Sequence, residues 1–467
     1  MLYHIIRKEM LLNLVSFRFI ISISLLFVLV VGSMNIMAVN YGRRLQDYSV
    51  GADMHATDLA SMNSRPQFEA FGVTKDPRPA MLGIFSIGLD PQMSRSISIP
   101  GFAMGGGGGG GGRIVFSYSK LAGVSPEGSK YANPIFNLFQ PPDFIYIVNI
   151  VLSLLAILFA FDCISGEKEN QTLKLMLTNS IPRDVILIGK WIGGTLSLLI
   201  PFIISFGIGF LTVMMRPNVD LSNGAGLRVL LILLLSLLFI AVFFLVGMVF
   251  STFAARSSTA LITSLFAWVF FVIVIPNIAP VISRQFVPIK TSDSIVREAE
   301  RMEQDMTHEI WKKERSDEEQ KKMVDKMHKD LPEKVRALED RWLNSLTSQV
   351  KLAMNISRIS PSADYIFAST AIAGTGVDDY QKLRDEILRY RTLLSDNRKI
   401  FIQNDDSKPI PMLYINILMD KVPVFEDRRL DVASSVNNAI VDFAILSVYM
   451  IVLFLIAFLK FLNYDVK

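Results

Sequence analysis

The chain has 467 residues, of which 51% are hydrophobic and 19% are charged, and its formal net charge is +4. Such a composition is too apolar for water-soluble domains, and it contains no dense basic run with interleaved aromatic residues, so it excludes a nucleic-acid-binding protein. The one cysteine, Cys163, excludes an internal disulfide. The composition predicts an integral membrane protein.

The chain opens with residues 1–16, in which His4, Arg7, Lys8 and Glu9 alternate with apolar residues. This pattern is typical of a cytoplasmic amphipathic helix at a membrane interface, with anchoring as its main role and contact with a soluble partner as a second one. The next segment, 17–40, is long enough to span a bilayer. Because no clear small-residue cleavage site follows it, we expect a retained span, not a cleaved signal peptide.

Five more apolar stretches reach the roughly 20 residues that a hydrocarbon core of about 30 Å requires. They are residues 144–162, 185–213, 227–250, 258–283 and 438–462. Six crossings place both termini on one side, and the Lys and Arg residues of the short loops favour the cytoplasm for that side, with a modest bias. We therefore expect a multi-pass protein of a bacterial inner (plasma) membrane with a cytoplasmic tail, 463–467.

The predicted fold class is an α-helical polytopic membrane protein with two extracytoplasmic insertions. The first insertion, 41–143, has short apolar runs between turn formers, which predicts a small mixed α/β domain. Its glycine run, Gly105 to Gly112, resembles a phosphate cradle, but Arg113-Ile114-Val115 follows it instead of Gly-Lys-Ser/Thr. We expect a flexible loop there.

The second insertion, 284–437, is expected to be mainly helical. Apolar residues recur at helical spacing among alternating charges over 291–358, which predicts a long helix or a helical hairpin, broken or kinked at Pro332. Methionine pairs with nearby histidines suggest a soft-metal site, and core packing is the simpler explanation of them. These residues are Met302, Met306, Met323, Met327, His308 and His328. We expect no metal site.

No catalytic or cofactor motif is visible in the chain. A Gly-x-x-x-x-Gly-Lys-Ser/Thr sequence does not occur, so the chain cannot bind ATP through a P-loop. The four histidines lie outside the predicted spans, which leaves no Ser-His-acid set within the membrane. We therefore expect that the chain is not an enzyme and carries no cofactor of its own.

Several residues interrupt the predicted spans and are candidates for a transport pathway. They are Pro201 in the third span, Pro276, Asn277 and Pro280 in the fifth, and Asp442 near the outer end of the sixth. Broken helices are tolerated in a membrane where a cavity or neighbouring helices satisfy the backbone. The alternatives are that the prolines only kink the helices for packing, and that Asp442 snorkels or starts its helix.

Residues 163–184 form a charged amphipathic stretch between two spans. Two interpretations are open from the residues alone. The stretch is either an ordinary amphipathic helix resting on lipid or a helix at the membrane face that contacts a soluble partner.

This region carries a resemblance to a known family. The residues Ser153 to Asp162, Ser165-Gly-Glu-Lys-Glu169, Thr172 to Leu177, Asn179, Arg183 and Gly189-Lys190 resemble the second span and following loop of ABC-2 type transporter permeases. The branch is that of the nitrous-oxide-reductase maturation permease, and Arg7 to Phe19 is similar to that family's amphipathic start. Gln171, Ser180 and Pro182 depart from the family pattern, where Gly, Pro and a small polar residue are usual.

The resemblance implies that residues 163–184 are the coupling helix, which docks in a groove of a separate cytoplasmic ABC ATPase subunit. The docking residues it implies are Gly166, Glu167, Glu169, Thr172, Leu173, Leu177 and Arg183. ATP and Mg would bind in that partner subunit. The implied assembly contains a second permease, as a homodimer or with a related paralogue, as well as membrane lipid and, as a further candidate, an envelope protein.

The function implied is that of a permease subunit that couples ATP hydrolysis by its partner to export or to conformational work on an envelope protein. The alternative from another class is a non-transporting membrane receptor or scaffold, with an extracytoplasmic sensor domain and a signalling loop at 163–184. Composition and charge do not separate these two hypotheses.

Overall fold

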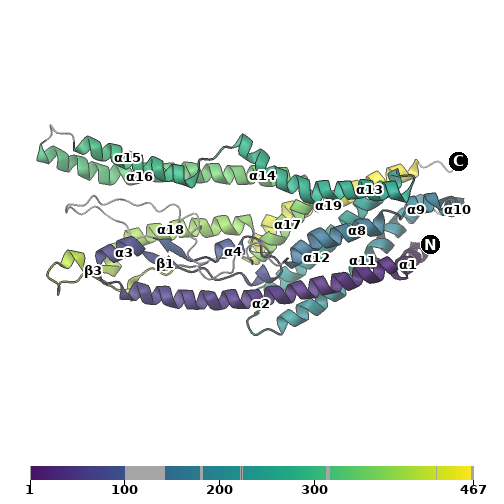
Figure 1. Ribbon diagram of the computed structural model, residues 1–467, viewed down its shortest axis with the longest axis horizontal. Helices are drawn as coiled ribbons and strands as arrows, with labels where there is room; N and C mark the ends of the chain where they lie inside the picture. The colour runs from purple at the N-terminus through teal and green to yellow at the C-terminus, as the bar shows by residue number, and fades with distance from the viewer. Residues whose placement is uncertain are drawn as a thin grey trace.

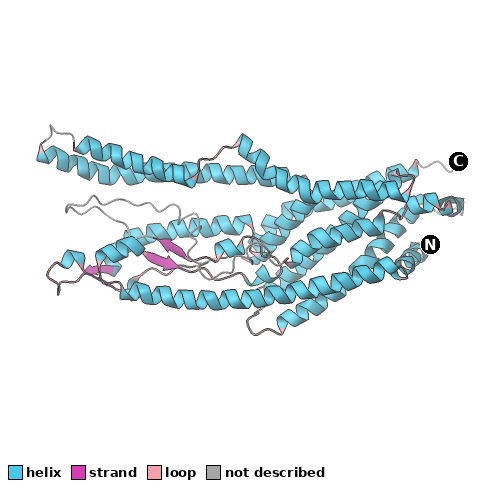
Figure 2. Cartoon of the chain, viewed as in Figure 1, coloured by secondary structure: helices cyan, strands magenta, loops and turns pink. Residues whose placement is uncertain are grey.

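The computed structural model describes residues 2–99, 142–178, 182–220, 222, 224–311, 316–426 and 429–463. The molecule is elongated and mainly helical (Figures 1 and 2). The glycine run, Gly105 to Gly112, lies outside the described residues, and so does the rest of 100–141.

Six helical runs are long and apolar enough to cross a membrane, which confirms the predicted number of spans. They are α2 (Phe17–Ser61), the run α7, η3, α8 and α9 (Phe144–Glu169), α11 (Arg183–Met214), α12 (Ala225–Phe253), the run α13, η4 and α14 (Ser257–Phe286) and α19 (Val432–Leu462). The second run divides into α7 (Phe144–Ile147), the π-helix η3 (Val148–Leu152), α8 (Ser153–Ala160) and α9 (Ser165–Glu169). The fifth divides into α13 (Ser257–Trp268), the π-helix η4 (Val269–Val274) and α14 (Ile275–Phe286).

Both chain ends lie at the same end of the molecule, which we call the terminal end (Figure 1). The short helices α1 (Leu2–Leu14), α9 and α10 (Thr172–Thr178) lie there too. Most of the described residues of the two insertions occupy the opposite, distal end. The arrangement of termini agrees with an even number of crossings.

Helix α12 forms the centre of the bundle, because it is apolar on every side and packs against α8, α17 (Pro361–Ala373) and α19. Its buried aromatic residues include Phe239, which stacks on Tyr365 of α17 with ring centroids 4.3 Å apart. The spans differ in burial. In the most apolar part, 72% of the α7–α9 run is buried, but only 17% of the α13–α14 run and of α19.

The two insertions share one hydrophobic core at the distal end. The first contributes α3 (Arg65–Phe71), α4 (Asp90–Met93) and the antiparallel pair β1 (Val73–Lys75) and β2 (Ile97–Ile99), whereas its η1 (Met81–Ile84) packs in the core of the helix bundle. The second contributes α18 (Val377–Phe401), β3 (Ile402–Asn404), η5 (Pro411–Leu413), β4 (Ile415–Ile417) and η6 (Met419–Lys421), with β3 and β4 antiparallel. The small sheet of the second insertion was not predicted, because its strands are only three residues long.

A helical hairpin of α15 (Ser292–Ile310) and α16 (Asp317–Ser357) extends along the distal end (Figure 1). The prediction of a break at Pro332 is wrong, because α16 continues through this position and the chain reverses between α15 and α16 instead. Met302, Met306 and Met327 pack against the apolar seam of the hairpin, as the core-packing alternative predicts.

Part of the second insertion returns into the bundle, which the sequence analysis did not foresee. Helix α17 packs between α12 and α19. The hydroxyl of Tyr365 lies 2.9 Å from Ser236 Oγ of α12, and Tyr449 of α19 donates to the Ile359 carbonyl at 2.6 Å. The segment 284–437 is therefore not wholly outside the spans.

Candidate functional site

The predicted coupling segment forms two short helices, α9 and α10, where the sequence analysis expected one helix. Gln171 separates them and has a φ of 61°, in the left-handed region. This conformation costs a residue with a Cβ about 1–2 kcal/mol and favours glycine. Gln171 keeps the turn at the expense of strain.

Helix α9 is bound to the end of α12. The backbone N–H groups of Ile164 and Ser165 both donate to Ser251 Oγ at 3.0 Å. Lys168 Nζ donates to the carbonyls of Thr252 at 2.5 Å and Ala254 at 3.2 Å. A lysine at the carboxyl end of a helix interacts favourably with the unpaired carbonyls and with the helix dipole. These hydrogen bonds attach α9 to the end of α12 and so to the helix bundle.

A buried charge network joins α9 to two further helices. Lys190 Nζ of α11 lies 2.8 Å from Glu9 of α1 and 2.9 Å from Glu167 of α9, and the lysine is 2% exposed. Lys8 lies 3.8 Å from the same Glu167 carboxylate. Removing one partner of a buried ion pair costs about 3–5 kcal/mol, because the other charge stays buried. We call Glu9, Glu167 and Lys190 the terminal triad.

Helix α1 reaches the triad because small residues of α11 let the two backbones approach. A Cβ on Gly193 would lie 2.9 Å from the Ile6 carbonyl oxygen and 3.2 Å from Ile6 Cα. No side chain fits there unless α1 moves. Gly193 therefore sets the close contact of α1 with α11.

The structure places the predicted docking residues on different faces. Leu173 is 0% exposed and packs against Ile5, Ile186 and Leu187, so it faces the bundle and not a partner. The side chain of Leu177 lies outside the described residues. Leu175, which the sequence analysis did not select, is 67% exposed on the outer face of α10.

Of the remaining predicted docking residues, some are exposed and others are partly buried or bound to other helices of the bundle. Glu169 and Thr172 are exposed, and Glu169 accepts a hydrogen bond from the Ser257 N–H at 3.1 Å. Gly166 and Glu167 are half-buried, and Arg183 donates to the carbonyls of Phe461 and Leu462 at the end of α19.

The exposed residues follow one another from the end of α9 to the first turns of α10, and we call this set the outer ridge. It consists of Glu169, Asn170, Gln171, Thr172, Lys174 and Leu175.

The site residues that were not predicted have no distinctive pattern in the sequence. Lys190 is a lysine near the start of an apolar span, and Glu9 is an acid in an interfacial helix, but their pairing requires the fold. The exposure of Leu175 and not Leu173 depends on the rotation of α10 after the turn at Gln171. Helical periodicity alone does not determine that rotation.

The candidate pathway residues are not brought together. Pro201 lies within α11, while Pro276, Asn277 and Pro280 lie in α14, where Asn277 and Pro280 are exposed. The π-helix η4 ends at Val274, two residues before Pro276, and such a turn accommodates the hydrogen bond that proline cannot donate. Asp442 is 2% exposed and paired with Arg358, so it does not snorkel.

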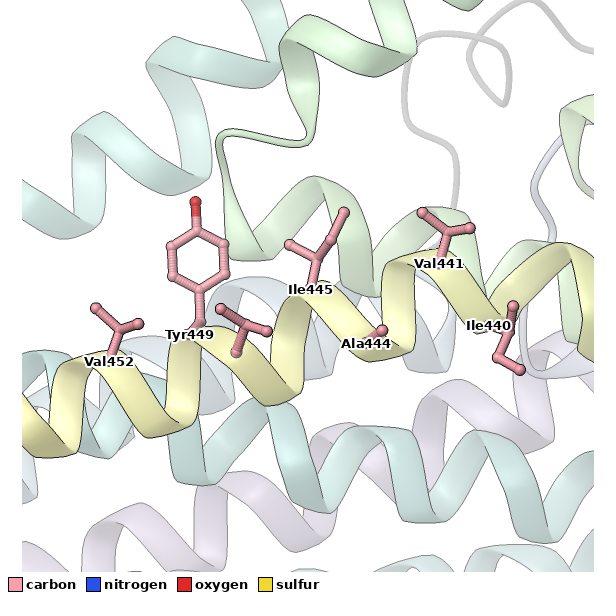
Figure 3. A pocket seen from close by; sticks show the side chains of 7 residues that line it. Ile440, Val441, Ala444, Ile445, Tyr449 and Val452 are labelled. Carbon is pink, nitrogen blue, oxygen red and sulfur yellow. The ribbon is translucent and has the colours of Figure 1, made fainter.

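An apolar groove follows the exposed face of α19 (Figure 3). It is lined by residues from Ile440 to Val452, and Tyr449 points from α19 toward the connection that precedes α17. Asp442 is not among the lining residues. In a bilayer this face meets lipid or another apolar protein surface.

Comparisons with known proteins agree with this architecture. The family described as ABC-2 family transporter protein matches residues 3–466. A protein named "Probable ABC transporter permease protein NosY" from Pseudomonas aeruginosa is 34% identical over 127 residues, which are 26% of this chain and 45% of that protein. Its namesake from Stutzerimonas stutzeri is 41% identical over 63 residues, 14% of this chain and 23% of that protein.

These two alignments therefore cover less than half of either relative. The family match, in contrast, extends over nearly the whole chain and includes all six spans. The chain belongs to the ABC-2 family of transporter proteins.

Proposed function

We propose that the chain is the membrane permease subunit of an ABC-2 transporter and that a separate ABC ATPase docks on the outer ridge of α9 and α10. In this proposal the terminal end faces the cytoplasm, and ATP and Mg bind to the ATPase. Closure of the ATPases moves the outer ridge, and the bundle carries the motion toward the distal end. The family membership and the surface described above support this assignment.

The terminal triad is the observation that carries the proposal. A surface that receives force must be attached to the spans, or it would bend without moving them. Glu167 of α9 binds the ammonium group of Lys190 of α11. The same ammonium group binds Glu9 of α1. Leu173 anchors α10 in the same region. An amphipathic helix resting on lipid would not need this buried attachment.

The proposed assembly holds two permeases and two ATPases. The exposed apolar faces of α19 and of the α13–α14 run are the surfaces available for a second copy or a related paralogue. The pair would either export a solute or perform conformational work on an envelope protein. The second alternative is favoured by α2, a single 45-residue helix that runs from the bundle into the distal end. At 1.5 Å per residue it is about 68 Å long.

Co-purification tests the docking surface. Leu175→Asp places a charge on the outer ridge without touching the packed core. Met215→Asp is the matched control, because Met215 is 85% exposed and follows α11 at the far side of the span. We expect the ATPase, identified by its peptides and by ATP hydrolysis, to be lost from Leu175→Asp and kept by Met215→Asp.

Retention of the ATPase by both variants would contradict docking on the outer ridge. Recovery of no ATPase with the wild-type chain would favour the receptor or scaffold hypothesis. In membrane vesicles, ATP hydrolysis accompanied by solute uptake would indicate export, and hydrolysis without uptake would indicate conformational work.

A further inference from the structure

A second charge cluster lies where α17 enters the bundle. Arg358 ends α16, and its guanidinium donates to the Asp442 carboxylate of α19, with Nε to Oδ1 at 2.6 Å and Nη2 to Oδ2 at 3.4 Å. Both oxygens of Asp442 are thus engaged by one cation. Arg358 and Asp442 therefore already form a two-point ion pair, and Arg358 needs no further carboxylate.

Asp364 is a further carboxylate of this cluster and has no such partner. It lies in the first turn of α17, and its side chain is 0% exposed. Neither of its oxygens meets a hydrogen-bond donor among the residues that the structure describes. The cap of α17 is provided by Ser360, whose hydroxyl accepts the Ser362 N–H at 3.2 Å.

The charged and titratable groups that act on Asp364 come from two elements. Arg358 belongs to the α16–α17 connection, and Asp442 and Tyr449 belong to α19. Asp378, at the start of α18, acts on Arg358 and Asp442 from further away. The nearby formal charges, with both aspartates ionised, would be one positive and two negative.

An ionised Asp364 would be strongly unfavourable in this position. The N-terminus of a helix stabilises a carboxylate by about 0.3–1 kcal/mol, whereas the burial of an unpaired charge costs several kcal/mol. A buried carboxyl group without a cation partner therefore keeps its proton. We propose that Asp364 is a proton-binding site, occupied at neutral pH while α17 is seated in the bundle.

Proton occupancy is coupled to the position of α17 in this arrangement. Asp364 can lose its proton without penalty only if water reaches it or if Arg358 leaves Asp442. The second event requires the α16–α17 connection to move, because Arg358 is held at α19. The proton thus stabilises the conformation in which α17 fills the space between α12 and α19.

Infrared spectroscopy of the full-length chain in lipid vesicles tests this site directly. A protonated carboxyl group has a carbonyl stretching band that a carboxylate lacks. We expect the spectrum of the wild type minus that of Asp364→Asn to contain this band at neutral pH. In the wild type the band should decrease as the pH rises through about 8, because burial raises the pKa of Asp364 to about 8.

Asp90→Asn is the matched control, because Asp90 is also 0% exposed but lies 2.6 Å from Arg44. Its difference spectrum should lack the band.

Labelling of the wild type with dicyclohexylcarbodiimide, which reacts with protonated carboxyl groups in apolar surroundings, gives a second readout independent of the variants. An adduct is expected on Asp364 and not on Asp442. Absence of the difference band at neutral pH, or an adduct on Asp442 in place of Asp364, would overturn the proposal.

Discussion

Each end of the bundle holds one cation near two carboxylates, but buried Lys190 and half-buried Arg358 are paired with them differently. At the terminal end, Lys190 contacts both Glu9 and Glu167. At the distal side, Arg358 forms an ion pair with Asp442, and Asp364 has no hydrogen-bond donor among the described residues. The first arrangement fixes three helices together. The second leaves a carboxyl group whose charge must be removed by a proton.

The difference fits two mechanical roles. A surface that receives force from a partner requires a firm attachment to the spans, and the terminal triad provides one. A segment that changes position requires an arrangement with two states of similar free energy, and a protonated carboxyl group beside an ion pair allows this. Four predictions test this comparison.

The largest effect is expected from Lys190→Met, which removes the cation of the buried Glu9 carboxylate and leaves half-buried Glu167 with only Lys8, 3.8 Å away. We expect a loss of about 3–5 kcal/mol in the free energy of unfolding, with faster hydrogen exchange in α1 and α9. The triple variant Glu9→Gln/Glu167→Gln/Lys190→Met should recover most of the loss, because it removes all three charges. A loss below about 1 kcal/mol in the single variant would show that the triad does not hold these helices together.

The next effect concerns the contact of α1 with α11. Gly193→Val should destabilise the protein by about 1–3 kcal/mol, because its side chain collides with the backbone at Ile6. Gly207→Ala, on the same helix, is the control, since a Cβ at Gly207 would meet no neighbouring atom within 4 Å among the described residues. Thermal unfolding of both variants measures the difference. Equal behaviour of the two would refute the close approach of α1.

The distal end should also respond to pH through Asp379, where burial raises the pKa to about 6 from its ordinary value of 3.8. Because the folded state binds this proton more tightly, the free energy of unfolding is highest below about pH 4 and falls as the pH rises to about 6. We expect a loss of about 1–2 kcal/mol, since each pKa unit corresponds to about 1.4 kcal/mol and the group is not fully buried.

Hydrogen exchange at the start of α18, corrected for the intrinsic rate, measures this dependence. In Asp379→Asn the protection should be the same at about pH 4 and at about pH 6. Protection that increases with pH in the wild type would contradict the direction of the shift.

The smallest effect is expected from Gln171→Gly. Glycine adopts the left-handed conformation without the Cβ penalty, so we expect a gain of about 0.5–1 kcal/mol in the stability of the α9–α10 region. Gln171→Val should have the opposite sign. Differential scanning of the three proteins measures both changes, and a destabilising glycine would show that the turn is not strained.

The sequence predicted the spans well, because a run of about 20 apolar residues has few alternatives to a transmembrane helix. The resemblance around Ser165 to Leu177 correctly indicated the family, and the coupling role of this region stays a prediction. It did not predict the inward side chain of Leu173, because the turn at Gln171 changes the rotation of α10. Asp364 was also missed, since one aspartate in a polar insertion gives no signal until α17 is seen inside the bundle.

The central claim is that the outer ridge touches an ABC ATPase, and site-directed cross-linking tests it most directly. The variant Cys163→Ala/Leu175→Cys carries one thiol on the outer ridge, and Cys163→Ala/Met215→Cys carries one beyond the far end of α11. After treatment of intact membranes with a thiol-to-amine cross-linker, we expect a covalent product with the ATPase from the first variant only. A product from the Met215→Cys chain alone, or labelling of Leu175→Cys only from outside the cell, would contradict the account.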